Sequence, residues 1–241
     1  MKSTASTSTA RPVPRTIAPH KIAWEVLMPG VMRKKIWAEP MWNDPSVPRE
    51  MSLMRYQPGT KVPLQNHVGG DEIVFVIEGV LSDEYGDLTA GNVAYRPEGC
   101  VHSLHSVNGA TTMSYVVGGI KQVAEKPANS PPSRVINVNE MAWQSAEGGR
   151  VQMKVIWHDP VGKRRFVLGK LAPGFVMDPH EHVGEELVFQ IEGSFVDEAG
   201  LLGPGDVGFR PFGCHHSFVS ENGGVGLGYI WGHSDYLRDR K

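Results

Sequence analysis

Two stretches of this sequence hold residues whose types and spacing could do chemistry. The segment PHEHVGEELVFQIEG, residues 179–193, places His180 and His182 one residue apart, with Glu186 four positions further on. His216 follows later, after the turn-like run GPGDVGFRPFGC. Residues two apart in a strand face the same side, so His180, His182 and Glu186 are expected to share one face. Three imidazoles and a carboxylate that meet in an apolar interior predict a metal site, because buried polar groups need partners.

The residue types leave the identity of the metal open. Nitrogen and oxygen ligands of this kind suit Fe(II), Mn(II), Co(II), Ni(II), Cu(II) or Zn(II). The alternative interpretation is a hydrogen-bonded polar cluster that holds no metal. Gln190 has the same strand parity as Glu186 and is also expected to face the interior, where it either orients a ligand or touches substrate, or is a satisfied core amide. We predict that Glu186 and Gln190 are the catalytic residues.

A second stretch, QNHVGGDEIVFVIEG at residues 65–79, repeats the pattern with one histidine missing. Gln65 stands where the first histidine is expected, while His67, Glu72 and His102 remain. Two histidines and one carboxylate can still hold Fe(II) and leave positions open for other ligands. Gln65 could add its carbonyl oxygen or hydrogen-bond a bound water. The alternative is that this half has lost tight metal binding and kept a structural role.

The elements that must position these residues belong to a long internal repeat. GVMRKKIW matches RVQMKVIW, and LTAGNVAYRPEGCVHS matches LLGPGDVGFRPFGCHHS. A repeat of this length with few gaps indicates a duplicated domain. We expect a flexible arm over residues 1–20, a first domain over 21–122, a linker over 123–137 and a second domain over 138–241, the linker being rich in proline, lysine and serine.

The strand pattern within each half predicts an all-β fold. EIVFVIEG and ELVFQIEG are apolar runs closed by glycine, which suits strands covered on both faces or lining a closed barrel. VLSDEYGDLTAGNVAYRP alternates short strands with Asp and Gly turns. The 28 glycines and 18 prolines favour many short strands joined by turns. We predict two small antiparallel barrels in tandem.

These motifs resemble those of the cupin superfamily, and they occur twice. The first cupin motif fits Gly174, His180, His182, Glu186 and Gly193, and in the first half Gly59, His67, Glu72 and Gly79. The second motif fits Gly205, Pro211, Gly213 and His216, and likewise Gly91, Pro97, Gly99 and His102. The chain looks more narrowly like cupins of the ChrR type and is similar in style to acetylacetone-cleaving and 2,4'-dihydroxyacetophenone dioxygenases. The resemblance implies one jelly-roll (double-stranded β-helix) barrel per half, each with a divalent metal inside.

Composition and charge narrow the function classes. A net charge of −2 gives no sign of a nucleic-acid binder, and no apolar run is long enough to cross a membrane. Two cysteines in matching places of the repeat make a mutual disulfide unexpected and suit a reducing cytoplasm. Arg96 and Arg210 precede the motif prolines, and we expect them to pair at a surface. A homodimer is the default oligomer.

Such a site could bind a β-diketone or hydroxyketone together with O2. We expect a mononuclear non-haem dioxygenase, most readily with Fe(II), that cleaves a C–C bond of a small oxygenated compound. An apolar wall made of Val188, Phe189 or its neighbours, and Phe218 would exclude water. A metal- or ligand-sensing binding module and an O2-independent isomerase or hydrolase are the alternatives. Much of this expectation depends on fold analogy, because one fold hosts many activities.

Overall fold

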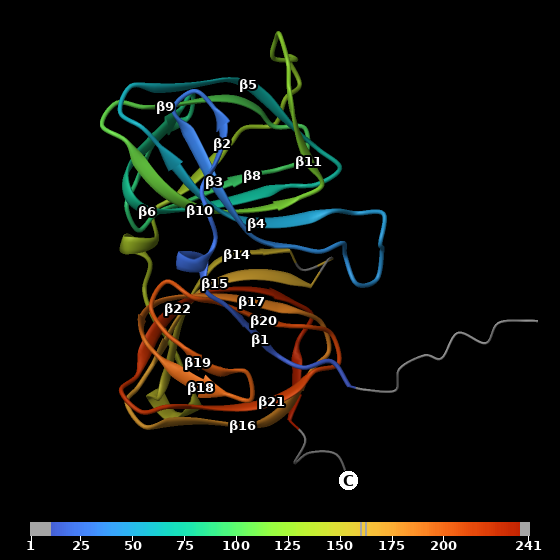
Figure 1. Ribbon diagram of the computed structural model, residues 1–241, viewed down its shortest axis with the longest axis vertical. Coiled ribbons are helices and arrows are strands. Elements are labelled where there is room, and N and C mark those ends of the chain that lie inside the picture. The colour runs from blue at the N-terminus through green and yellow to red at the C-terminus, as the bar shows by residue number, and fades with distance from the viewer. Residues whose placement is uncertain (1–10, 160, 162, 237–241) are drawn as a thin grey trace, which may run out of the picture. The chain divides into compact units, whose positions relative to one another are not determined.

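The computed structural model describes residues 11–236 except 160 and 162, and its regular structure is almost entirely β-strand. The chain divides into two compact units, one over Ala18–Gln144 and the other over Met1–Ile17 with Ser145–Lys241. We call them the first barrel and the second barrel (Figure 1). The predicted all-β fold of two tandem barrels is confirmed. Among the described residues, no helix has the length and apolar character needed to span a membrane.

The first barrel is built from eleven strands whose pairing is antiparallel. Their order is β11-β5-β9-β6-β10-β4-β3-β2, with β7, β8 and β12 attached beside it. The apolar run of the second stretch forms the long strand β6, which pairs with β10 on one edge and with β8 on the other. The strands are β2 (Glu25–Met28), β3 (Val31–Ala38), β4 (Arg49–Tyr56), β5 (Thr60–Val68), β6 (Glu72–Asp83), β7 (Gly86–Thr89), β8 (Val93–Arg96), β9 (Val101–Ser106), β10 (Ala110–Val117), β11 (Gly119–Gln122) and β12 (Arg134–Ile136).

The second barrel has two facing sheets. The larger has the order β1-β20-β17-β22-β15-β14-β13 and the smaller the order β19-β18-β21-β16-β23. Three short 3-10 helices, η1 (Pro19–Lys21), η2 (Val138–Glu140) and η3 (Glu147–Gly149), lie in connecting segments. The strands are β1 (Arg15–Ile17), β13 (Gln144–Ala146), β14 (Val151–Asp159), β15 (Arg164–Leu171), β16 (Phe175–His182), β17 (Glu186–Gly193), β18 (Phe195–Asp197), β19 (Gly200–Leu202), β20 (Val207–Arg210), β21 (His215–Ser220), β22 (Gly224–Trp231) and β23 (Ser234–Tyr236).

Two segments expected to be an arm and a linker contain strands. Part of the expected arm, Arg15–Ile17, pairs with β20 of the second barrel as strand β1. Part of the expected linker, Arg134–Ile136, pairs with β8 of the first barrel as strand β12. Each segment satisfies backbone groups at a sheet edge that would otherwise be unpaired. The signal in the sequence is weak because each strand is only three residues long.

The glycine that closes each apolar run is required by the backbone. Gly79 and Gly193 both have positive φ, +79° and +64°, a region that side chains rarely adopt. A Cβ on Gly79 would lie 2.2 Å from the carbonyl oxygen of Gly109, and one on Gly193 would lie 2.1 Å from that of Gly223. Each run therefore ends where two backbones approach too closely for any side chain.

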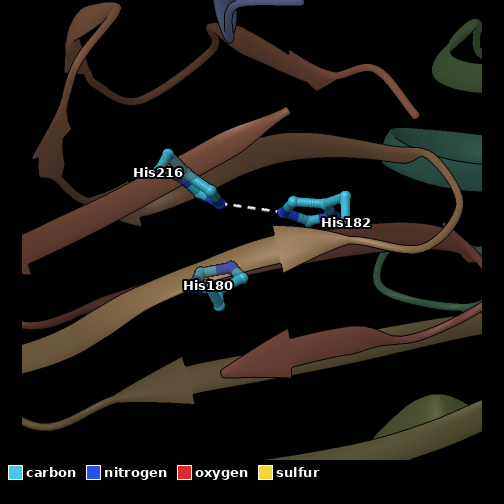
Figure 2. Close-up of side chains that lie close together, drawn as sticks. All are labelled: His180, His182 and His216. Carbon is cyan, nitrogen blue, oxygen red and sulfur yellow. Dashed lines mark hydrogen bonds between the residues drawn. The ribbon is translucent and has the colours of Figure 1, made fainter. Parts of the chain in front are cut away.

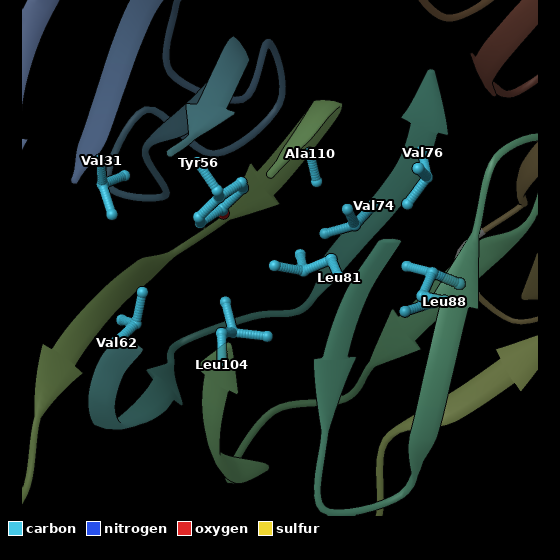
Figure 3. Close-up of a cluster of buried hydrophobic side chains, with 10 residues drawn as sticks. Val31, Tyr56, Val62, Val74, Val76, Leu81, Leu88, Leu104 and Ala110 are labelled. Atoms are coloured by element: carbon cyan, nitrogen blue, oxygen red, sulfur yellow. The ribbon is translucent and has the colours of Figure 1, made fainter. Parts of the chain in front are cut away.

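Alternating side chains of the strands fill the interior of the first barrel. In β5, Thr60 and Val62 are buried while Lys61 and Pro63 are exposed, as the period of two requires. Each fully buried Val or Leu side chain contributes about 1.5–3 kcal/mol of hydrophobic free energy. The cluster shown in Figure 3 consists of Val31, Tyr56, Val62, Val74, Val76, Leu81, Leu88, Ala94, Leu104 and Ala110.

Candidate metal centre

Three histidine rings converge inside the second barrel. His180 and His182 lie on the same face of β16, and the antiparallel register places His216 of β21 opposite His180. The Nε2 atoms of His182 and His216 are 2.9 Å apart, and all three rings gather at one point (Figure 2). One ring nitrogen from each of the three lies within 4.8 Å of the others, and all three side chains are buried. Strand alternation and register thus build the cluster without a loop.

Contacts at Nδ1 orient two of the three rings. Nδ1 of His180 lies 2.9 Å from the carbonyl oxygen of Asp178, which can only accept, so Nδ1 carries the proton. Nδ1 of His216 lies 3.4 Å from Oδ2 of Asp197, a carboxylate contact that is longer than the hydrogen bond of His180. Metal-binding histidines commonly donate their second ring N–H to a carbonyl or carboxylate. The proton on Nδ1 of His180 leaves the lone pair on its Nε2, and Nε2 of His216 lies 2.9 Å from Nε2 of His182.

Burial favours the neutral form of His180 and His182, which is the form that binds metals. Burial lowers the pKa of His180, while its bond to the Asp178 carbonyl opposes that shift in part. Burial, helped by the neighbouring rings of His216 and His180 and by Arg210, lowers the pKa of His182 to about 2. At neutral pH, therefore, a proton does not compete with a metal ion for the lone pair of His180 or of His182.

Glu186 and Gln190 border the cluster from strand β17. Oε2 of Glu186 lies 4.0 Å from Nε2 of His182, and its side chain is 21% exposed, so it stands at the edge of the three-histidine group. Gln190 is buried and donates from Nε2 to the carbonyl oxygen of Glu192 at 2.8 Å. Both line a cavity of about 160 Å³ in the second barrel, which His216 also reaches. Carboxylate, amide and imidazole therefore face one cavity.

The remaining wall of this cavity is apolar and follows the strand period. Val188 and Phe218 line it, as expected from the sequence. Phe189 is buried but does not line the cavity, whereas its neighbours Val188 and Gln190 do. It lies between Val188 and Gln190 in β17 and therefore points to the opposite face of the sheet.

The first barrel has the corresponding cluster with a smaller nitrogen set. His67 and His102 have their Nε2 atoms 3.0 Å apart with nearly parallel rings, and Oε2 of Glu72 lies 3.5 Å from Nε2 of His67. Gln65 points its Nε2 to within 3.3 Å of Nε2 of His102. The structure therefore brings all four residues together around one point. A neighbouring cavity of about 210 Å³ reaches Gln65 and Glu72.

Glu72 differs from its counterpart Glu186 because its carboxylate is already held. Arg96 donates from Nη1 to Oε2 of Glu72 at 2.9 Å, and Ser114 donates to Oε1 at 2.6 Å. Burial alone would raise the pKa of Glu72, but Arg96, the two histidines and Ser114 outweigh it and lower the pKa to about 2. In the second barrel Gly228 takes the place of Ser114. Glu72 is thus fixed in place, while Glu186 is less constrained.

Arg96 and Arg210 are buried, which corrects the expectation that they pair at a surface. Their side chains are 1% and 0% exposed, and their partners Asp83 and Asp197 are equally buried. Arg96 lies 3.3 Å from Oδ2 of Asp83, and Arg210 contacts Asp197. An interior charge requires a partner, and each barrel supplies one from β6 or β18. The sequence motifs did not predict Asp83 and Asp197 as partners, although these residues begin DEYG and DEAG at matching places in the repeat.

Both cysteines are buried free thiols that no step of the site requires. Burial raises the pKa of Cys100 to about 11 and that of Cys214 to about 12. Reactive cysteines have lowered pKa values, so these thiols pack in turns and do not act as nucleophiles.

The residues of the second barrel fit a divalent metal ion. Two nitrogens that each lie about 2.1 Å from a metal at right angles are about 3.0 Å apart. The 2.9 Å separation in the second barrel and the 3.0 Å separation in the first match that spacing. The three nitrogens with Glu186 nearby form a nitrogen and oxygen donor set suited to Fe(II), Mn(II), Ni(II), Cu(II) or Zn(II). His180, His182, His216 and Glu186 would hold the ion in the second barrel, and His67, His102, Glu72 and Gln65 in the first.

We expect the exchange Gln65→His to strengthen metal binding in the first barrel. It adds a nitrogen ligand where the side chain already lies 3.3 Å from His102, and one further imidazole raises affinity by about tenfold or more. Calorimetric titration with Zn(II), in a chain whose second centre carries His182→Ala, measures this. Asn66→His is the matched control, because Asn66 points to the other face of β5. Equal affinities for the two variants would contradict the expectation.

We also expect the metal-free protein to lose stability in mild acid. Burial, followed by Arg96, lowers the pKa of His102 to about 2, and His182 behaves likewise. In the unfolded chain these groups titrate near 6.5, so the unfolded state binds more protons below that pH. Their neutral burial therefore costs little above about pH 6.5, and each lowers stability by up to about 1.4 kcal/mol per pH unit below it.

Urea unfolding of the metal-free protein at pH 8, 6.5 and 5.5 tests this dependence. The unfolding midpoint should fall slightly between pH 8 and 6.5, where the unfolded imidazoles are half protonated, and much further at pH 5.5. The variant His102→Gln, which removes one titrating ring, should show a shallower fall. A midpoint that does not change between pH 8 and 5.5 would show that these rings are not buried in the neutral form.

The comparisons with known proteins agree with this architecture. The family described as "ChrR Cupin-like domain" matches residues 13–120 and 132–227, which cover most of both barrels. No significant match was found among curated protein sequences. A crystal structure of a candidate dioxygenase from Nostoc punctiforme is similar to this chain, with a TM-score of 0.69 and 14% identity over 93% of this chain and 83% of that one.

Oxalate decarboxylase from Bacillus subtilis is also similar in structure. One variant of that enzyme gives a TM-score of 0.67 and 17% identity over 97% of this chain and 82% of the enzyme. A second structure of it, whose description names Mn(II) centres, gives a TM-score of 0.67 and 16% identity over the same shares. At these identities the likeness concerns the fold alone.

Proposed function

This chain belongs to the ChrR cupin-like domain family, and on that premise we propose that it is a metal-dependent enzyme whose working site lies in the second barrel. The reaction we propose is a non-haem dioxygenase reaction that cleaves a C–C bond of a small β-diketone or hydroxyketone. The observation that carries this proposal is the three-histidine cluster, which opens with Glu186 onto a largely apolar cavity. Family and fold do not define a reaction, so the argument depends on the site.

The two barrels are proposed to have different roles. In the second barrel three imidazoles can hold a metal while Glu186 is less constrained. In the first barrel Arg96 and Ser114 hold Glu72, so this carboxylate cannot easily move a proton. A group that transfers protons must be able to change its partners during the reaction. The first barrel therefore binds a metal more weakly or serves as a scaffold.

The chemistry divides between the metal and the chain. A bound divalent ion, for which we propose Fe(II), supplies Lewis-acid activation of a ketone oxygen and a route for electrons to O2. Oε2 of Glu186 takes the proton from the carbon next to the ketone. Gln190 holds the substrate beside it, and Val188 and Phe218 keep water out. A 1,3-diketone plus O2 gives a carboxylic acid and a dicarbonyl fragment, with both oxygen atoms incorporated and the substrate as reductant.

Oxygen consumption by the metal-loaded protein tests the proposed function. The protein is loaded with Fe(II) under nitrogen, mixed with a β-diketone or hydroxyacetophenone, and then exposed to O2 in an oxygen electrode. We expect O2 uptake that requires both iron and substrate. Turnover without O2 would favour a metal-assisted isomerase or hydrolase, and tight Zn(II) binding without turnover of any substrate would favour a sensing module. Either result would overturn the dioxygenase proposal.

Two further features of the protein are proposed with this function. Free, buried Cys100 and Cys214 suit a reducing cytoplasm, where disulfides are rare. We propose a homodimer as the working assembly, because closed pairs are the commonest form of soluble oligomers. Light scattering of the purified protein measures its molar mass and so tests whether it is a dimer.

A further inference from the structure

We propose that the cavity of the second barrel binds a single planar aromatic ring that carries an oxygen substituent. The ring lies between a flat strip of glycines and two phenylalanines, and its oxygen points to the histidine end. This inference names the substrate class of the site described above, and it therefore rests on the proposed function.

One wall of the cavity is built from glycines on two neighbouring strands, which we call the glycine floor. Gly224, Gly226 and Gly228 of β22 have the same parity and all line the cavity, together with Gly169 of β15. Gly169 pairs directly with Gly226 across the strands. Without side chains, this part of the sheet exposes flat backbone to the cavity. Such a surface accommodates a planar group at close contact.

The first barrel shows that the fold does not require glycine at the positions of Gly169, Gly226 and Gly228, whereas a Cβ on Gly224 would lie 2.8 Å from the carbonyl oxygen of Glu192. The matching strands of the first barrel are β4 and β10. There Met54 occupies the position of Gly169, and the positions of the three glycines of β22 are occupied by Ala110, Thr112 and Ser114. The register is the same, because Met54 pairs with Thr112 as Gly169 pairs with Gly226. Four side chains are thus absent from the second barrel in one patch. Glycine weakens a strand, so this loss of stability points to a need for space.

Aromatic side chains from the smaller sheet complete the cavity opposite this floor. Phe195 of β18 and Phe218 of β21 both line the cavity, and their ring centroids are 4.7 Å apart at an angle of 38°. The ring centroids of His216 and Phe218 are 6.1 Å apart, so the aromatic wall continues to the histidine cluster. Aromatic pairs prefer tilted or offset contacts at such distances. A ring above the glycine floor would therefore meet the faces or edges of these phenylalanines.

The volume of the cavity suits one ring. Its volume is about 160 Å³. An engineered apolar cavity of about 150 Å³ in another protein holds benzene. A ring of benzene size therefore matches the volume of this cavity, and a fused pair of rings needs more room.

One end of the cavity is polar and defines where the oxygen lies. Arg210 is fully buried and lines the cavity beside Glu186 and His216. Its Nη2 contacts Asp197, while Nε and Nη1 have no hydrogen-bond partner among the residues that the structure describes. In the first barrel the equivalent arginine uses Nη1 to hold Glu72. The free donors of Arg210 thus offer a hydrogen bond to an acceptor oxygen on the ligand.

Binding measurements without turnover test this inference separately from the proposed reaction. The protein is loaded with Zn(II), which has no redox chemistry, and titrated by calorimetry with acetophenone, cyclohexyl methyl ketone and 2-acetylnaphthalene. We expect acetophenone to bind at least about tenfold more tightly than either of the other two ketones. The cyclohexyl ring is not planar and is too thick for the space between the glycine floor and the phenylalanines, and the naphthalene ring is too large. Equal affinity for acetophenone and the cyclohexyl ketone would overturn the inference.

Alanine variants of the glycine floor provide the second arm of the test. A Cβ on Gly226 would lie 3.2 Å from Gln190 Oε1 and Val188 Cγ1, and one on Gly228 would lie 3.2 Å from Val167 Cγ2, so small side-chain shifts accommodate either methyl group. Gly226→Ala and Gly228→Ala should each weaken acetophenone binding by about tenfold. Gly203→Ala is the matched control, because its Cβ would have an ordinary contact of 3.7 Å and the residue does not line the cavity.

The two proposals fail in distinguishable ways. If acetophenone binds and the floor variants weaken it, but no substrate consumes O2 with Fe(II), the dioxygenase proposal fails and the ring site stands. If O2 uptake occurs with aliphatic diketones and the floor variants bind acetophenone as the parent does, the ring site fails. Thermal unfolding of each variant shows that it is folded, and the two floor variants are independent of each other.

Discussion

Replacing His182 with alanine is expected to remove metal from the second barrel. His182 supplies one of three convergent ring nitrogens, and its Nε2 lies 2.9 Å from that of His216. Loss of one of three imidazoles lowers the affinity for a divalent ion by about a hundredfold or more, because two rings and Glu186 would have to bind the ion. Elemental analysis of protein freed of unbound metal by gel filtration should show the loss of the second-barrel equivalent.

The matched control for this substitution is His215→Ala. His215 is the neighbour of His216 in β21, but its Nε2 lies 3.0 Å from Oε2 of Glu181, which places the ring outside the cluster. The control should keep the metal content of the parent protein. If His182→Ala retained the full metal content, the ligand set assigned to the second barrel would be wrong. If both substitutions lost metal equally, the effect would come from the fold and not from the ligand.

Replacing Arg96 with leucine should have the largest effect on stability. Arg96 is almost fully buried and contacts two buried carboxylates, Glu72 at 2.9 Å and Asp83 at 3.3 Å. Leucine would leave two acidic groups without their cation in the interior of the first barrel. Breaking a buried ion pair from one side costs about 3–5 kcal/mol. Urea unfolding at pH 7.5, followed by fluorescence, measures the change.

Two further variants separate lost charge pairing from lost packing. Neutralising the carboxylates as well, with Arg96→Leu, Glu72→Gln and Asp83→Asn together, should recover a large part of the lost stability. Arg33→Leu removes a cation that also contacts two carboxylates but is partly exposed, so it should cost no more than about 1 kcal/mol. Equal costs for the two arginine variants would show that burial does not determine the strength of these pairs.

Much of the architecture could be predicted because it follows from the period of the strands. The alternation in β16 places His180 and His182 on one face, and the repeated motifs identify the matching His67 and His102. Apolar runs closed by glycine predict β6 and β17, where the structure has them. These features depend on neighbours in the sequence, which a single chain displays directly.

Features that depend on contacts between distant segments could not be predicted in the same way. Arg96 contacts Glu72 and Asp83, which lie 24 and 13 positions away in the sequence. The residue type alone does not distinguish a buried arginine from one at the surface. In the sequence, Gly226 is only a residue that weakens a strand. The structure shows that it pairs with Gly169 and that both glycines line the same cavity. Strand β1 depends on an edge of β20, which only the folded barrel provides.

Anomalous diffraction from crystals of the metal-loaded protein, recorded at the absorption edge of the metal, tests the central claim most directly. The account predicts a peak in the second barrel about 2.0–2.2 Å from one nitrogen each of His180, His182 and His216. A peak bound elsewhere on the chain, or no peak while these three rings form only hydrogen bonds to one another, would contradict it.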